Sequence, residues 1–96
     1  MSRLQFTQRA GNDLDRLTDF LLDQSQAAAE STTELMIDGL QIPRQHPRIG
    51  RVRSEGLREL VISRGKTGYV ALYRYDEIRD VARVLALRHQ RELGEI

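Results

Sequence analysis

The carboxyl-terminal part of the chain brings together side chains that could bind anions or transfer protons. The apolar stretch VLAL, residues 84–87, runs directly into Arg88, His89, Gln90 and Arg91. The arginine guanidinium forks onto phosphates and carboxylates, and histidine is the side chain whose ordinary pKa suits acid–base catalysis near neutral pH. We therefore consider these four residues as candidates for binding an anionic partner or for acid–base catalysis. The alternative for His89 is a half-exposed residue at the end of a strand.

Two more arginines interrupt segments that otherwise have the composition of β-strands. Arg58 lies in LRELVIS, residues 57–63, and Arg74 lies in YVALYRY, residues 69–75. A charged side chain inside a strand requires a partner or water. Each arginine could pair with an acidic residue on a neighbouring strand, or it could bind an anion on an open face of the sheet. The sequence leaves both alternatives open.

Other patterns that would indicate a reaction are incomplete. SRGKTG, residues 63–68, contains letters of a phosphate-binding loop, but that loop needs glycine where Leu60 stands and a helix afterwards. We interpret the segment as a hairpin turn. The two histidines, His46 and His89, are far apart, and cysteine is absent. We therefore predict no metal site and no cofactor, and the residue types alone favour no catalytic set.

Composition and charge indicate a small soluble protein with two unlike halves. A chain of 96 residues with 40% hydrophobic and 30% charged residues is typical of one domain, which we place at residues 1–96. No apolar stretch is long enough for a membrane span, no signal peptide is recognisable, and we expect a cytoplasmic location. Residues 1–42 carry three basic and seven acidic residues (net −4), whereas residues 43–96 carry twelve basic and seven acidic residues (net +5). The second half would therefore face an anionic partner, unless its arginines are simply solvated.

The first half of the chain has the pattern of a short strand and a helical hairpin. RLQF, residues 3–6, is a strand candidate, and Thr7 can cap a helix whose apolar stripe is Ala10, Leu14, Leu17 and Leu21. Ser25 can cap a second helix, which Pro43 and Pro47 end or kink. Gly11 inside the first helix costs stability and suggests a close contact there.

The second half has the pattern of an antiparallel meander. HPRIGRVRSEG, residues 46–56, reads as a loop, and strands are expected at 57–63, 69–75 and 80–88. The fold class is therefore α+β, with the order β-α-α-β-β-β and a helical hairpin packed on an antiparallel sheet. Tyr69, Tyr73 and Tyr75 share one strand face, which could stack on bases but is more typical of a core. The residues predicted to be buried are Leu14, Leu17, Leu21, Leu35, Leu40, Leu60, Ile62, Leu72, Val84 and Leu85.

An ordered set of short motifs resembles toxins of the RelE/ParE superfamily, which belong to type II toxin–antitoxin systems. The resemblance covers essentially the whole chain. It rests on Ala10…Asp13-Leu14, Pro47 followed by Gly50-Arg51, Gly56-x-Arg58-Glu59, Tyr69-Val70…Tyr73-Arg74 and Val84-Leu85…His89-Gln90-Arg91. It implies that the last strand lies near the middle of the sheet, so that VLAL is core and the residues after it reach a functional rim.

The superfamily contains two kinds of toxin, and the resemblance favours one of them. RelE-like members are ribosome-dependent endoribonucleases that cut mRNA, and ParE-like members poison DNA gyrase. The ribonucleases imply an arginine at the position of Val70, and valine cannot hold a scissile phosphate. The GLRE step and the YVALYR strand are more similar to the ParE branch. We therefore expect a gyrase poison with no catalytic residues. One alternative is a metal-independent ribonuclease that uses Arg58, Arg74, His89 and Arg91. Another is a decayed, non-toxic module that only binds an antitoxin.

The resemblance also implies a protein partner. A cognate antitoxin, ParD-like or similar, would neutralise the toxin in a hetero-oligomer by covering a hydrophobic groove near the helices and the basic sheet surface. The residues expected to contact the target or the antitoxin are Arg58, Arg74, Arg88, His89, Gln90 and Arg91.

Overall fold

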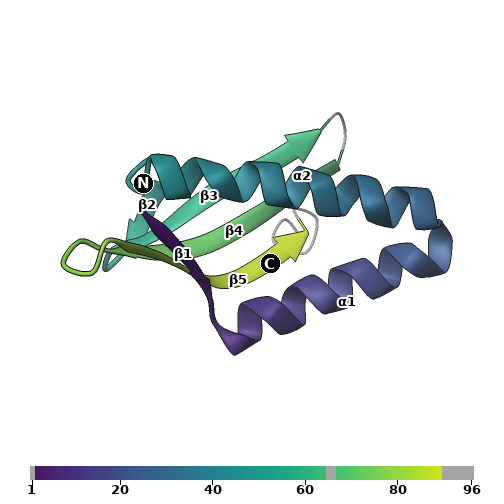
Figure 1. Ribbon diagram of the computed structural model, residues 1–96, viewed down its shortest axis with the longest axis horizontal. Coiled ribbons are helices and arrows are strands. Elements are labelled where there is room, and N and C mark those ends of the chain that lie inside the picture. Colours follow the sequence, from purple (N-terminus) through teal and green to yellow (C-terminus); the bar gives the residue numbers. More distant parts are fainter. Residues whose placement is uncertain (1, 65–66, 90–96) are drawn as a thin grey trace.

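A helical hairpin lies across one face of a five-stranded sheet in the computed structural model, which describes residues 2–64 and 67–89 (Figure 1). The order along the chain is β1 (Arg3–Phe6), α1 (Gln8–Gln24), α2 (Gln26–Gln45), β2 (Arg51–Ser54), β3 (Leu57–Arg64), β4 (Thr67–Asp76) and β5 (Val81–His89). The α+β class and the helical hairpin agree with the prediction. Among the described residues, no helix is long and apolar enough to cross a membrane.

Side chains that the sequence marked as caps begin both helices. The Thr7 hydroxyl accepts a hydrogen bond from the Ala10 N–H at 3.1 Å, and the Ser25 hydroxyl accepts one from the Ala28 N–H at 3.2 Å. Each cap satisfies a backbone donor that has no partner inside the helix. Ser25 also ends α1, which makes the connection short and the hairpin tight. Pro43 lies inside α2 and does not end it, since the helix continues to Gln45.

The sheet differs from the prediction in two ways. Its order is β1-β5-β4-β3-β2, and β1 pairs with β5 in parallel, so the sheet is mixed and not wholly antiparallel. Residues 51–54 form β2 at one edge, whereas we expected a loop over 46–56. The meander β3-β4-β5 is antiparallel as expected. The segment SRGKTG contains the end of β3 and the start of β4, and it leads into a strand instead of the helix of a phosphate-binding loop. β5 lies inside the sheet, which agrees with the implied place of VLAL.

All ten predicted core residues are buried or partly buried, but the core also contains residues that were not predicted. Leu17, Leu40, Ile62 and Val84 are buried, and the other six are partly buried. The largest fully buried side chains include Tyr69 and Tyr73, which together with Met36, Ala71, Ala82 and Leu87 complete the cluster between sheet and helices. Tyr69 and Tyr73 are therefore core, whereas Tyr75 is only partly buried and its hydroxyl donates to Oδ1 of Asp80 at 2.7 Å. A bulge opposite Leu72 and Tyr73 lets β5 turn both Val84 and Leu87 toward this cluster, although they are three positions apart.

The two layers approach each other closely at Gly39. A Cβ atom built on Gly39 would lie 2.7 Å from Cγ2 of Ile62 on β3, so α2 can press against the sheet only because this residue has no side chain. A Cβ atom on Gly11 would meet nothing within 4 Å. The expectation of a close contact at Gly11 was therefore wrong, and the contact occurs on the other helix.

Alanine at these two helical glycines should have opposite effects on stability. Gly39→Ala should lower the free energy of unfolding by ~1–3 kcal/mol, because the added methyl group overpacks Ile62. Gly11→Ala should raise it by ~0.5–1 kcal/mol, because alanine is the better helix former and the site has room. Urea denaturation followed by circular dichroism measures both. Equal effects of the same sign would contradict this packing.

Candidate functional site

Helix α1 holds the carboxyl-terminal end of β5, because the neighbouring strand β1 is too short to reach it. β1 pairs with β5 only as far as Phe6 and Val84. Beyond that point the Thr7 N–H donates to the Val84 carbonyl at 3.0 Å, and the Thr7 hydroxyl donates to the Leu85 carbonyl at 3.1 Å. The chain thus leaves the sheet and enters α1 while it still satisfies the open edge of β5.

The carboxylate of Asp13 completes this replacement for a strand. Asp13 is only 7% exposed, and its Oδ2 accepts the Leu87 N–H at 3.0 Å. Its Oδ1 lies 3.4 Å from Nη1 of Arg88 and 4.0 Å from Nη2 of Arg16. A buried carboxylate is tolerated when hydrogen bonds and cations compensate its charge, and here both are present. Arg88 is therefore engaged within the fold.

His89 lies on the helix-facing side of the sheet at the opposite end of β4 from Arg58. Its ring meets Tyr69 edge to face, with centroids 5.2 Å apart and planes at 83°. The two residues are cross-strand partners, and His89 is partly buried. The aromatic contact fixes the ring at the rim of the core. Gln90 and Arg91, the other two candidates in this segment, lie outside the described residues.

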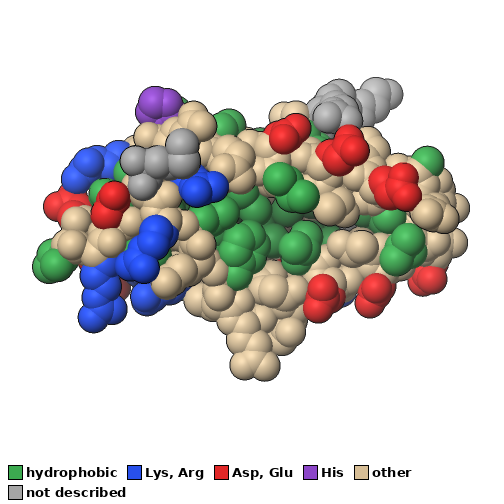
Figure 2. Space-filling view, viewed as in Figure 1, with side chains coloured by type: hydrophobic (Ala, Val, Ile, Leu, Met, Phe, Trp, Pro, Cys, Tyr) green, Lys and Arg blue, Asp and Glu red, His purple; other side chains and the backbone are tan. Residues whose placement is uncertain are grey.

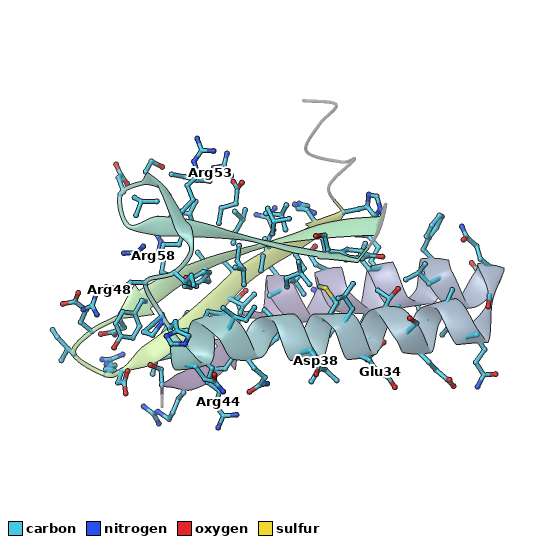
Figure 3. All side chains as sticks on the ribbon, turned by 90° about the horizontal axis from the view of Figure 1, so that it is seen from above. Glu34, Asp38, Arg44, Arg48, Arg53 and Arg58 are labelled. Atoms are coloured by element: carbon cyan, nitrogen blue, oxygen red, sulfur yellow. The ribbon has the colours of Figure 1, made fainter. Side chains whose placement is uncertain are left out.

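Arg58 clamps the segment that joins α2 to β2. Its Nη1 donates to the carbonyl of Arg48 at 2.8 Å and to that of Gly50 at 2.9 Å. Arg58 is partly buried opposite Tyr73, so it stands on the helix-facing side of the sheet (Figure 3). Within the described residues, its partners are these two backbone carbonyls and not an acid on a neighbouring strand. The charge is stabilised by two carbonyl dipoles, a third possibility that the sequence did not suggest.

The hydroxyl group of Tyr73 holds the same segment from beneath. It accepts the Gly50 N–H at 2.8 Å and donates to the Pro47 carbonyl at 2.9 Å. Burial raises the pKa of Tyr73, although the Gly50 N–H and the positive charge of Arg58 oppose this rise. A Cβ atom on Gly50 would lie 2.7 Å from the Tyr73 ring, so only glycine allows the backbone to reach the hydroxyl. We call residues 46–50, held in this way, the clamped segment.

Arg74 lies on the other face of the sheet, which the helices leave uncovered. It is exposed, stands directly opposite Arg83 on β5, and donates through Nη1 to the Glu55 carbonyl. Arg58 and Arg74 therefore point to opposite sides. His89 pairs with Tyr69 whereas Arg58 pairs with Tyr73, so the two are offset along β4 by four residues, or roughly 13 Å. They also lie on strands on opposite sides of β4. The described members of the ribonuclease set do not converge.

Charge is strongly segregated over the surface. On the helix-covered face, acidic side chains lie along the hairpin at one end and arginines gather at the other end (Figure 2). Glu34 and Asp38 project from α2, whereas Arg48, Arg53 and Arg58 lie at the end of the sheet remote from the tip of the hairpin (Figure 3). Apolar side chains are visible between α1, α2 and β1 (Figure 2). The partly buried Leu4, Leu14, Leu35 and Leu60 pack against the core in this layer.

Comparison with known proteins gives a family. The model of the ParE toxin of the type II toxin–antitoxin system parDE matches residues 4–94. The chain belongs to the ParE toxin family. This confirms the resemblance to the RelE/ParE superfamily and makes the protein a toxin of type II toxin–antitoxin systems.

A curated relative and solved structures from both branches are similar to this ParE-family chain. Toxin RelE3 of Caulobacter vibrioides is 34% identical over 93 residues, covering 96% of this chain and 98% of the relative. The chromosomal ParDE system of P. aeruginosa has a TM-score of 0.75 at 20% identity, covering 93% of this chain and 96% of that one. The intact E. coli RelBE complex has a TM-score of 0.60 at 18% identity, covering 92% and 95% respectively. These structures show a shared fold, and the names span both branches.

Two residues of the site escaped the sequence analysis. Asp13 was marked only as part of a family motif, and Tyr73 only as part of a family motif and of a tyrosine stripe typical of a core. The exposed or buried state of a carboxylate on a polar helix face cannot be read from its spacing, because it depends on where β1 stops. Gly50 was a usable signal, since glycine is the default residue where the backbone must approach another group closely.

Removing the Tyr73 hydroxyl should destabilise the toxin. Tyr73→Phe leaves the Gly50 N–H and the Pro47 carbonyl without their partner, which should cost ~1–3 kcal/mol in the free energy of unfolding. Tyr69→Phe is the matched control on the same strand face, because the hydroxyl of Tyr69 makes no hydrogen bond within the described residues. Urea unfolding of both variants measures the difference. A loss no larger than that of the control would argue against the clamp.

Proposed function

We propose that this toxin poisons DNA gyrase and has no catalytic chemistry of its own. The observation that carries the proposal is Val70, an apolar residue where the family resemblance would place an arginine in a ribonuclease. Val70 is 3% exposed and stands between Val61 on β3 and Arg88 on β5. Nothing at this position can donate a hydrogen bond to a phosphate.

RNA cleavage through the 2′-hydroxyl adds negative charge to the phosphate in the transition state. A preorganised donor aimed at such a charge contributes on the order of 3–4 kcal/mol. A valine contributes none of this. A toxin that acts by binding has no such requirement, and it needs a rigid surface of suitable charge and shape.

Two of the candidate arginines are occupied in the fold, which also supports a binding toxin. Arg88 stands opposite Val70, and Arg58 lies on the other face of the sheet. Arg58 donates to the carbonyls of Arg48 and Gly50, and Arg88 pairs with Asp13. Recruiting either to a substrate phosphate would break these contacts. The toxin residues that would contact the target then include Gln90 and Arg91, which follow β5 in the sequence, together with Arg74 on the uncovered face.

The second candidate function is a ribosome-dependent mRNA endoribonuclease of the RelE type. The relative at 34% identity is named Toxin RelE3, and His89 is a partly buried histidine at the rim. If this function holds, His89 and Arg91 are the first residues to test as acid, base or phosphate-binding groups.

Purified toxin should inhibit supercoiling by gyrase and increase covalent gyrase–DNA complexes, while mRNA on translating ribosomes stays intact. The physical reason is that a binding surface is present and the phosphate-stabilising arginine is not. The measurements are an agarose-gel supercoiling assay, trapping of cleaved DNA with detergent, and primer extension on mRNA from induced cells.

A shortened chain comprising residues 1–89 is the control for this assay. It keeps all of β5 and removes the candidate contacts Gln90 and Arg91, so it should fold by circular dichroism and fail to inhibit gyrase. Codon-specific mRNA cuts with normal supercoiling would overturn the gyrase proposal and support the ribonuclease.

We also propose that a cognate antitoxin of the ParD type neutralises the toxin. The similar P. aeruginosa and E. coli structures are described as toxin–antitoxin systems. An amphipathic segment of the antitoxin suits the apolar surface between α1, α2 and β1, and acidic residues next to it suit the arginines at the other end of this face (Figure 2). The antitoxin would order its segment on binding.

Co-expression with the product of the neighbouring gene should give a complex that survives affinity purification at low salt. Because Leu35 contributes to the apolar surface, Leu35→Asp should weaken the complex at least about tenfold, on the scale of one lost anchor residue. Asp23→Asn, at the acidic tip of α1, is the control and should leave affinity unchanged. Calorimetry measures both. A complex that tolerates Leu35→Asp would place the antitoxin elsewhere.

A further inference from the structure

The sheet face that the helices leave uncovered carries arginines on several neighbouring strands. Side chains on a strand alternate between faces, so the pairing register identifies this set. Arg83 on β5 stands directly opposite Arg74 on β4, and Arg51 on β2 lies opposite Glu59 on β3. Arg3 on β1 alternates with the inward-facing Leu4 and lies on the same side. Arg53 lies at the bulge of β2, and its Nε reaches Glu59 on this face at 3.3 Å. We call Arg3, Arg51, Arg53, Arg74 and Arg83 the arginine row.

Acidic residues compensate only part of this charge. On this face Glu59 lies 3.3 Å from Nε of Arg53, and Asp76 is paired with Arg79 at 3.9 Å. Within the described residues, the Arg83 guanidinium makes no ion pair or hydrogen bond. Like charges placed directly opposite each other destabilise a sheet. The facing pair of Arg74 and Arg83 is thus a local cost that an external anion would remove.

The side chains around the arginine row indicate what kind of anion fits. Tyr69, Tyr73 and Tyr75 all face the helices, and the described residues of the uncovered face include no aromatic ring. Proteins that hold single strands rely on aromatic side chains on which bases stack. A duplex stacks its bases inside and presents phosphates on its surface. A flat set of arginines can contact these phosphates without contacting the bases. The acidic side chains along the helices lie in the other layer (Figure 2).

We propose that the arginine row binds the phosphate backbone of duplex DNA. This inference rests on the proposed function in one respect: gyrase holds the duplex that the toxin would contact. The row then adds an electrostatic contact with the DNA of the target complex to whatever contact the toxin makes with the enzyme itself. Binding is independent of base sequence and weakens steeply with salt.

The test measures binding of the full-length toxin to a labelled duplex of mixed sequence by fluorescence anisotropy at two salt concentrations. The double variant Arg74→Gln/Arg83→Gln should bind about tenfold more weakly at low salt and lower the slope of log affinity against log salt by about 2. Arg83→Gln alone keeps the contact of Arg74 with Glu55 and should give about half of this change in slope. The control Arg9→Gln removes one positive charge, as Arg83→Gln does, at an exposed position of α1. This variant should bind the duplex as tightly as the parent does.

Several results would overturn the inference. These are no duplex binding at low salt, tighter binding of the matching single strand, an equal loss in Arg9→Gln, or a loss of antitoxin affinity in the double variant without a loss of duplex binding. The supercoiling assay separates this inference from the proposed function. Inhibited gyrase without duplex binding would refute the arginine row alone. Duplex binding without inhibition would refute the gyrase proposal and leave the row intact.

Discussion

The rest of the fold depends on one constraint: the backbone groups at the edge of β5 need hydrogen-bond partners where β1 ends and α1 begins. β5 lies inside the sheet, and its last residues have no strand on one side. An unpaired backbone N–H at this depth would cost about as much as a lost hydrogen bond. The Asp13 carboxylate removes that cost at Leu87 and is itself neutralised by Arg88. One side chain thereby sets the position of α1 and orients the segment that leads to the rim.

The same arrangement explains how far the sequence could predict the fold. Periodicity and caps were sufficient for both helices, because Thr7 and Ser25 make the local hydrogen bonds that their positions suggested. The parallel pairing of β1 was not predictable, since four residues with one apolar face fit either direction. β2 was missed because all four of its residues are exposed, so burial leaves no alternation in its sequence. Its pairing with β3 depends on backbone hydrogen bonds and not on side-chain type.

The candidate site was predictable in composition and not in geometry. The sequence marked each arginine as unusual, but the partner of each depends on groups that no sequence pattern identifies. Arg58 is stabilised by carbonyls of the clamped segment, which reach it only because Gly50 allows the backbone to touch Tyr73. Arg74 lies sixteen positions after Arg58 and faces the opposite side of the sheet. Predicting this requires the pairing register of β3 and β4, which the sequence does not give. Charge alone could not separate a structural arginine from an available one.

Separating these two classes changes how the surface charge should be interpreted. Arg58 and Arg88 are engaged by carbonyls or by a buried carboxylate, so they stiffen the clamped segment and the end of β5. Among the described residues, the arginines that remain for a partner are mainly those on the uncovered face and around the end remote from the hairpin tip. Because acidic residues line both helices, a polyanion would be repelled from the hairpin and attracted to the other face. At physiological salt this preference acts over roughly 8 Å, so it orients the toxin only once the partner is close. An antitoxin bound between the helices would therefore leave the uncovered face accessible, unless a second segment of the antitoxin crosses the sheet edge. If that face stays accessible, neutralisation requires that the target also contacts the helix-covered side.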